Sequence, residues 1–386
     1  MRLSVASQLE TLKLKERVGN IISNGRRAFM LDTQRFVSGL QANGIDFFTG
    51  VPDSLLKSFC AYVTDTCGGN HVIAANEGGA VGLAAGHYLA TGKSALVYMQ
   101  NSGQGNAVNP LASLADPDVY SIPMVLLVGW RGEPGVKDEP QHVKQGKVTI
   151  SLFETLGIPI EILPDDDESA ANVTRKMVEK AKAESRPVAL IVRKGLFAEY
   201  KLQNKKPDIA ALPREQAIEE ILKSLPEDAV AVSTTGMISR EVYETRERLG
   251  QDHSRDFLTV GSMGHASMIA LGIAKAQPNR KVYCLDGDGA SIMQMGNMAI
   301  VGQSGCANLT HIVFNNAAHD SVGGQPTVGG AINLSAIAAS CGYNREGSPV
   351  FREVKVAKGA RKDLGRPKEP PQVNKKLYME TLGGCV

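Results

Sequence analysis

The residues best suited to chemistry lie in two short segments, separated by one predicted helix and one predicted strand. The first is Asp-Gly-Asp-Gly at 286–289, directly after an apolar run that ends at Leu285. The second is Asn-Asn at 315–316, directly after the apolar run 311–314. Because parallel strands end at the same edge of a sheet, Asp288 and one of the asparagines are expected to meet there. Carboxylate and amide oxygens suit a Mg²⁺ ion that keeps water and phosphate oxygens in its shell.

The glycines beside Asp288 favour a diphosphate as the other ligand of that metal. Gly287 and Gly289 leave backbone amides accessible at the start of a segment in which apolar residues recur at helical spacing. Amides at a helix N-terminus bind phosphate groups. Gly-Asp-Gly alone is more often an ordinary strand-to-helix turn. The asparagine pair after the next strand makes the pattern specific.

Together the two segments resemble the motif of thiamine diphosphate enzymes. The sequence His-Asp-Ser-Val-Gly-Gly-Gln-Pro-Thr at 319–327 further resembles the phosphonopyruvate decarboxylase family, and the resemblance covers nearly all of residues 30–386. It implies thiamine diphosphate and Mg²⁺ as cofactors, held by Gly287, Asp288 and Gly289. It also favours Asn316 over Asn315 as a metal ligand, with the carbonyl of Ala318 as a further one. The residues alone leave the choice between the two asparagines open.

The composition is that of a soluble protein large enough for two domains. The chain has 386 residues, of which 43% are hydrophobic and 21% charged, and it contains 40 glycines. A net charge of +2 gives no argument for a nucleic-acid partner, and no apolar run approaches the length of a membrane span. Six cysteines show neither metal-site spacing nor a secreted framework. We therefore expect an intracellular protein, cytoplasmic unless its N-terminus directs it elsewhere.

Strands and helices are predicted to alternate twice over, which indicates an α/β fold of two doubly wound parallel-sheet domains. The expected domains are 30–200 and 213–386, joined by a polar linker at 201–212. Residues 1–29 are basic, and they leave open a mitochondrial transit peptide or a basic amphipathic helix. The resemblance implies that the first domain binds the pyrimidine and the second the diphosphate. It further implies a homo-oligomer, at least a dimer, with sites between subunits.

Polar side chains follow several predicted strands of the first domain. Asp53, in the turn after the first strand, is either a proton-transfer residue by resemblance or a simple helix cap. Glu77 begins a predicted helix, where an acid is electrostatically favourable. The resemblance assigns Glu77 to the pyrimidine ring, where it activates the cofactor. Ser102 and Gln104 stand in a polar loop after another strand and are candidates for substrate binding.

The segment 129–142 is too long for a mere connector and contains Arg131 and His142. It is either a solvated charge cluster or, as the resemblance favours, a substrate loop. Other 2-oxo acid decarboxylases have two histidines in this region, and the single one here leaves the role of His142 open. Arg361, in a basic run after the last predicted strand, is a further candidate for binding an anionic substrate.

The second domain offers two glycine-containing turns before the Asp288 motif. By motif position, Thr235 and Gly236 would help to hold the diphosphate, and the carbonyl of Gly261 would accept from the pyrimidine amine. Met263 would lie between the two cofactor rings and keep them bent. A methionine among glycines can equally fill a core.

The resemblance implies decarboxylation of 3-phosphonopyruvate to phosphonoacetaldehyde and CO₂, with Glu77 activating the cofactor and Asp53 or His319 moving protons. A sulfopyruvate decarboxylase is the nearest alternative, because basic residues in the 129–144 region favour an anionic substrate without choosing between phosphonate and sulfonate. A non-catalytic subunit that binds the cofactor is an alternative of another class. The presence of Glu77, Asp288 and Asn316 together weighs against it.

Overall fold

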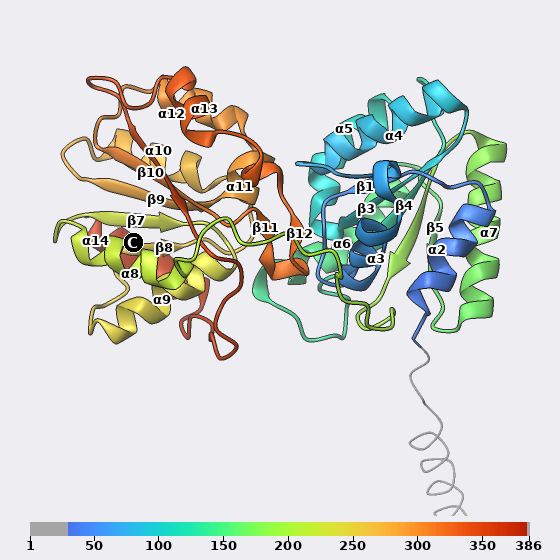
Figure 1. Cartoon of the computed structure of the whole chain (residues 1–386), viewed down its shortest axis with the longest axis horizontal. Helices are drawn as coiled ribbons and strands as arrows, with labels where there is room; N and C mark the ends of the chain where they lie inside the picture. Colours follow the sequence, from blue (N-terminus) through green and yellow to red (C-terminus); the bar gives the residue numbers. More distant parts are fainter. Residues whose placement is uncertain (1–29, 384–386) are drawn as a thin grey trace, which may run out of the picture.

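Two parallel β-sheets, each covered by helices, follow one another along the chain (Figure 1). The computed structural model describes residues 30–383. The predicted α/β fold of two doubly wound domains is confirmed. The predictions made for residues 1–29 fall outside the described residues.

The first sheet has six strands in the order β2-β1-β3-β4-β6-β5, and every neighbouring pair is parallel. Its central strands are buried along their whole length because helices cover both faces, which explains their continuous apolar runs. The strands are β1 (Phe48–Gly50), β2 (His71–Ile73), β3 (Ala95–Gln100), β4 (Met124–Gly129), β5 (Ile160–Ile162) and β6 (Pro187–Val192). The helices are α2 (Thr33–Ala42), α3 (Lys57–Thr66), α4 (Glu77–Thr91), α5 (Gln104–Ser113), α6 (Pro140–Thr155) and α7 (Asp167–Glu184).

The second sheet has five parallel strands in the order β13-β10-β9-β7-β8. They are β7 (Val230–Ser233), β8 (Asp256–Leu258), β9 (Val282–Gly287), β10 (Leu309–Asn315) and β13 (Val350–Lys355). The helices around it are α8 (Arg214–Ser224), α9 (Met237–Arg248), α10 (Ala266–Ala276), α11 (Asp288–Met293), α12 (Gly296–Gly302), α13 (Leu334–Cys341) and α14 (Pro371–Thr381). A small antiparallel pair, β11 (Ala318–His319) and β12 (Gln325–Pro326), lies between the two domains (Figure 1).

The connector between the domains is divided between them by its hydrogen bonds. Leu31 exchanges backbone hydrogen bonds with Leu196 and Ala198, so the first part of the connector lies on the first domain. The carbonyl of Leu212 accepts from Ala357, which places the last part on the second domain. The domain limits assigned from the sequence stay a prediction.

Two expected element boundaries were wrong. Helix α6 begins at Pro140, inside the segment 129–142 that was expected to be a loop. Proline is tolerated in the first helical turn because its missing N–H would have no partner there. The end of the predicted substrate loop is therefore helical. Helix α3 begins at Lys57 after Leu56, and no side chain caps it, so the alternative in which Asp53 is the helix cap was wrong. Among residues 30–383, no helix is long and apolar enough to cross a membrane.

Candidate active site

Asp288 lies at the end of β9, where the chain turns through Gly287 into α11. Its carboxylate is buried and accepts hydrogen bonds from the Thr327 hydroxyl and from backbone amides, including that of Asn316. Burial raises the pKa of Asp288 to about 6, although these hydrogen bonds lower it. No lysine, arginine or histidine of the described chain forms an ion pair with this carboxylate. A buried acid without a positive partner is chemically suited to a divalent cation.

The two asparagines at the end of β10 donate to different partners but accept in the same way. Asn315 is fully buried, and its side-chain amide donates to the Gly329 carbonyl and to Glu353 at 2.7 and 2.8 Å, while its oxygen accepts from the Ala317 amide at 3.0 Å. Asn316 donates to Asp320 and accepts from the Ala318 amide at 3.0 Å, so its side-chain oxygen keeps one lone pair. Each side-chain oxygen therefore accepts one backbone amide and keeps one lone pair, so these hydrogen bonds do not choose between the two asparagines. Asn316, which the resemblance favours as a metal ligand, stays a prediction.

The segment after the asparagines has a constrained backbone. Ala317 has a φ of 57°, a conformation that residues other than glycine adopt at a cost of order 1 kcal/mol. Ala318 and His319 then pair with Pro326 and Gln325 in the small β11–β12 ladder. The His319 ring packs on Gly289, since a Cβ built at that glycine would lie 3.2 Å from the ring. Burial lowers the pKa of His319 to about 4.

The other residues expected to hold the cofactor also cluster around turns with unusual backbone. The Thr235 hydroxyl accepts from the Gly261 amide at 3.0 Å, which ties the two turns together. Gly236 and Gly261 have φ values of 97° and 72°, and Ser262 has 49°. Met263 follows directly and is partly buried. These are positions at which glycine is favoured or strain is stored, as is common at ligand sites.

In the first domain, Glu77 begins α4 with its carboxylate almost fully buried. Its Oε2 accepts from the Asn106 amide at 2.7 Å, and Gly103 lies so close that a Cβ there would be 2.3 Å from Oε1. Burial raises the pKa of Glu77, and the Asn106 hydrogen bond opposes this. The carboxyl is therefore held nearer to its protonated form than an exposed glutamate.

Asp53, in the turn after β1, and Arg131, which follows β4, lie close together. Asp53 is completely buried at the end of β4, where a Cβ at Gly129 would be 2.1 Å from its Oδ2. That oxygen accepts from the Leu55 amide at 2.9 Å, and Oδ1 has no partner within the described chain. Burial raises the pKa of Asp53 to about 6, while the Leu55 amide and Arg131 lower it.

Arg131 is held in place by Asp138. Its guanidinium donates to both carboxylate oxygens of Asp138, at 2.8 and 2.5 Å, and to the Ser54 hydroxyl at 2.8 Å. His142 is buried nearby with an unpartnered Nδ1, and burial, with the charge of Arg131, lowers its pKa to about 4. The segment 129–142 thus brings Arg131 and His142 to the end of the strand next to Asp53.

Three candidates for substrate binding are engaged elsewhere. Gln104 is buried and donates to the Thr149 carbonyl while accepting from Gln145, so it serves the core. Ser102 is exposed and accepts from Gln100. Arg361 forms ion pairs with three carboxylates, those of Glu215, Glu244 and Asp363. Within residues 30–383, no hydrogen bond or ion pair joins the side chains of these three residues to Asp53 or to the Arg131 guanidinium, and their role in substrate binding stays a prediction.

Several functional neighbours were missed by sequence reasoning. Asn106 and Asp138 are in segments singled out for their polarity, but nothing in their spacing showed that they contact Glu77 and Arg131. Thr327 closes the 319–327 motif, and that position was a usable signal for its contact with Asp288.

The site residues form two groups, one in each domain. Within residues 30–383, no hydrogen bond or ion pair joins Glu77 or Asp53 to Asp288. The domains do touch nearby, since a Cβ built at Gly261 would lie 3.3 Å from the Cβ of Gln141. Gln325 also donates weakly to the Lys57 carbonyl at 3.5 Å.

Comparison with known proteins identifies both domains. Residues 33–152 match the thiamine pyrophosphate enzyme N-terminal TPP binding domain, and residues 234–375 match the C-terminal TPP binding domain. Each domain therefore contains one of the two groups of site residues.

Full-length relatives agree with these matches. Phosphonopyruvate decarboxylase from Streptomyces hygroscopicus is 32% identical over 91% of this chain and 94% of its own length. The enzyme of that name from Streptomyces viridochromogenes is 33% identical over 89% and 92%. Sulfopyruvate decarboxylase subunit beta from Methanothermobacter thermautotrophicus is 38% identical over 34% of this chain and 68% of its own. With an α/β fold, both cofactor-binding domains and full-length similarity, this chain belongs to the phosphonopyruvate decarboxylase family of thiamine diphosphate enzymes.

Proposed function

We propose that the protein decarboxylates 3-phosphonopyruvate to phosphonoacetaldehyde and CO₂. The observation that carries the proposal is the position of Arg131, whose guanidinium is fixed by Asp138 beside the buried carboxyl of Asp53. A fixed guanidinium binds a phosphonate through paired hydrogen bonds. The full-length relatives named phosphonopyruvate decarboxylase support the same substrate.

The positive charge that would bind the phosphonate comes from Arg131 and not from a histidine. Asp138 raises the pKa of Arg131, which stays cationic. The pKa values of His142 and His319 are both about 4, so both rings are neutral near pH 7. In this environment they can only act as neutral hydrogen-bonding groups.

Glu77 and Asp53 supply the proton chemistry in this proposal. When bound, the thiazolium ring of thiamine diphosphate supplies an electron sink that no amino-acid side chain offers. Glu77, buried and oriented by Asn106, would hold a proton at the pyrimidine ring. Asp53 has a pKa of about 6 and a free Oδ1, so it can exchange a proton near neutral pH. His319 stays a second candidate for the same transfer.

Mg²⁺ would be held by Asp288, Asn316 and the Ala318 carbonyl, with diphosphate oxygens completing its shell. The buried, unpaired carboxylate of Asp288 and the free lone pair of Asn316 support this ligand set. Gly287 and Gly289 carry no side chain, so the diphosphate could approach the backbone of this turn closely, and Thr235 and Gly236 would bind its other side. Met263 and the Gly261 carbonyl would hold the pyrimidine.

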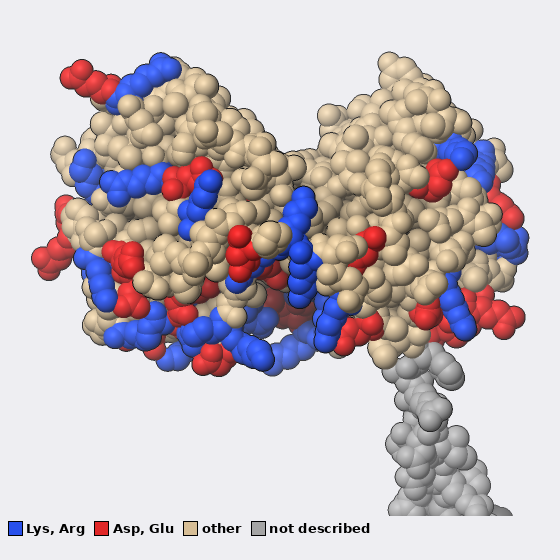
Figure 2. Space-filling view, viewed as in Figure 1, with Lys and Arg blue, Asp and Glu red and all other residues tan. Residues whose placement is uncertain are grey.

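We further propose a homo-oligomer whose active sites lie between subunits. In support, helix α4 exposes a stripe of small and apolar residues in which added Cβ atoms at the glycines would meet nothing. The stripe consists of Gly79, Gly82, Leu83, Gly86 and Leu89. The surface over α4 and α5 carries almost no charge in the space-filling view (Figure 2). A close helix contact across subunits would cover it.

Five described cysteines are free thiols, which favours a reducing compartment such as the cytoplasm. The basic segment 1–29 leaves the mitochondrial matrix as the alternative.

A sulfopyruvate decarboxylase is the second candidate. It is favoured by the similarity to a sulfopyruvate decarboxylase subunit, and Arg131 binds a sulfonate as readily as a phosphonate.

The test is an aldehyde-release assay with Mg²⁺ and thiamine diphosphate on 3-phosphonopyruvate, sulfopyruvate and pyruvate. We expect phosphonopyruvate to be turned over fastest, and Glu77→Gln to lower kcat by about 10²-fold or more. Glu179→Gln changes an exposed carboxylate on α7 and serves as the matched control. If sulfopyruvate were turned over faster than phosphonopyruvate, the proposed substrate would be wrong, but the proposed decarboxylation would stand. Cofactor binding without turnover of any oxo acid would support a non-catalytic subunit.

A further inference from the structure

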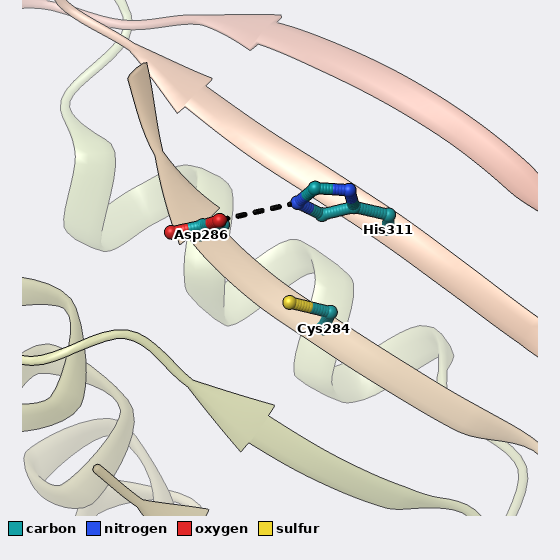
Figure 3. Close-up of side chains that lie close together, drawn as sticks. All are labelled: Cys284, Asp286 and His311. Carbon is teal, nitrogen blue, oxygen red and sulfur yellow. Dashed lines mark hydrogen bonds and ion pairs between the residues drawn. The ribbon is translucent and has the colours of Figure 1, made fainter. Parts of the chain in front are cut away.

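A second polar cluster lies beneath the Asp288 turn, inside the second sheet. Cys284 and Asp286 point to the same face of β9, and His311 is the partner of Cys284 on the neighbouring strand β10. All three side chains are buried, and their potential ligand atoms lie within 4.8 Å of one another. Figure 3 shows the Asp286 carboxylate facing the His311 ring, with the Cys284 sulfur to one side.

The polar side-chain atoms of Asp286 and His311 have hydrogen-bond partners without a metal ion. Oδ1 of Asp286 accepts from the Gly287 amide at 2.9 Å, and Oδ2 accepts from the Ser291 hydroxyl at 2.9 Å and from His311 Nε2 at 3.2 Å. The Tyr343 hydroxyl lies 3.3 Å from the other ring nitrogen of His311 and can donate to it. Burial raises the pKa of the Cys284 thiol well above its ordinary value, which disfavours the thiolate that a metal needs.

The Asp286 carboxylate contacts three parts of the chain that surround the candidate metal site. Gly287 is the turn before Asp288, and Ser291 is in the first turn of α11, so two of the hydrogen bonds fix the start of that helix. His311 belongs to β10, which ends at Asn315 directly before Asn316. Asp286 therefore connects the strand that leads to Asp288 with the strand that leads to Asn316.

We propose that Asp286 and His311 are positioning residues, which hold the Gly287 turn and the two strand ends so that Asp288 and Asn316 can share one Mg²⁺. This rests on the proposed function, because it assigns those residues to the metal. Groups that orient metal ligands from behind typically change metal affinity by about 10–100-fold when removed. The buried pair would act through Asp288 without contacting metal, diphosphate or substrate.

The experiment measures thiamine diphosphate binding by calorimetry at a series of Mg²⁺ concentrations, together with thermal unfolding without cofactor. We expect Asp286→Asn and His311→Leu to raise the Mg²⁺ concentration at half-saturation about tenfold or more. His311→Gln keeps a side-chain amide donor for Asp286 and should recover part of the affinity. At saturating Mg²⁺, KM for the oxo acid should stay that of the wild type, because the substrate groups are in the other domain.

Asp256→Asn is the matched control. Asp256 is another buried carboxylate of the second domain, and it accepts two hydrogen bonds from Arg246, far in sequence from the Asp288 turn. Its substitution should lower the unfolding temperature without changing Mg²⁺ affinity. Ser291→Ala removes one hydrogen bond only and covers the case in which Asp286→Asn fails to fold.

The results separate this inference from the proposed function. Wild type that binds thiamine diphosphate without any Mg²⁺ dependence would overturn the metal assignment itself. A Mg²⁺-dependent wild type with His311→Leu and Ser291→Ala unchanged in affinity would overturn only the positioning role. Equimolar zinc in the purified protein that disappears in Cys284→Ala would show a metal site in the cluster and would also overturn it.

Discussion

One candidate catalytic side chain of this protein, that of Asp53, is buried at a cost in folding free energy. Asp53 is completely buried, has one oxygen without a partner in the described chain, and has a pKa raised from about 3.8 to about 6. A raised carboxyl pKa means that the folded state binds the proton more tightly than the unfolded state. Stability is therefore lost as the pH rises from about 4 to about 6.

Asp53→Asn removes this titration and should stabilise the protein at pH 8. Raising the pKa of Asp53 by roughly two corresponds to about 3 kcal/mol, which is an upper value for the gain in unfolding free energy. The gain should shrink towards pH 4, where Asp53 is protonated in both states. Denaturant unfolding at pH 4, 6 and 8 measures it, with the exposed Asp118→Asn as control. A pH-independent difference between Asp53→Asn and wild type would contradict the burial argument.

At the scale of elements, strand ends bring together groups that are distant in sequence. The turn after β3 presents Gly103 to Glu77 at the start of α4, and α5 then supplies Asn106. The absence of a side chain at Gly103 decides where the glutamate can lie. Its backbone has an ordinary φ of −73°, so only space, and not conformation, requires glycine there.

Gly103→Ala should therefore lower activity by displacing the Glu77 carboxylate. The added Cβ would lie 2.3 Å from Oε1, and a misplacement of about 1 Å costs on the order of 10²-fold in rate. Gly105→Ala is the control, because a Cβ there meets nothing within 4 Å and replaces glycine inside α5. We expect it to keep activity and to gain some stability. Equal activities of the two variants would show that Glu77 tolerates displacement.

Helices and strands were predicted well where apolar residues recur at a regular spacing or where a motif is present. Buried strands appeared as apolar runs, and polar residues after them located Glu77, Asp53 and Asp288 at strand ends. The partners of these residues could not be predicted, because a contact such as Asn106 with Glu77 depends on how two helices pack. The hydrogen bond from the buried Gln104 side chain to the Thr149 carbonyl could not be predicted either, because it depends on how α6 packs on the start of α5.

At the scale of the whole molecule, each domain contains one group of candidate site residues, and the proposed reaction uses both groups. The proposed dimer would join Glu77 of one subunit to Asp288 of its partner. The uncharged stripe on α4, the helix that begins with Glu77, supports that arrangement. Glu77→Gln and Asp288→Asn chains, each expected to be inactive alone, should then form one active site when they pair with each other.

Co-expression of Glu77→Gln and Asp288→Asn chains with different affinity tags tests this. A hetero-oligomer purified through both tags should have about half of the wild-type activity, because one of the two sites in each dimer has both intact residues. Each variant alone should be inactive. Sites formed within single chains would leave the hetero-oligomer inactive, with cofactor binding to the Glu77→Gln chain showing that it is folded.

The connector between β6 and α8 is a point at which the chain could be divided into two polypeptides. No strand of either sheet is supplied by the other half, so a break between Gln203 and Lys206 would leave every strand beside its neighbours. The sulfopyruvate decarboxylase relative that matches a third of this chain is itself named as one subunit of an enzyme. Joining two such polypeptides in one reading frame guarantees that they are made in equal numbers. A single gene then needs no separate control to balance its two halves.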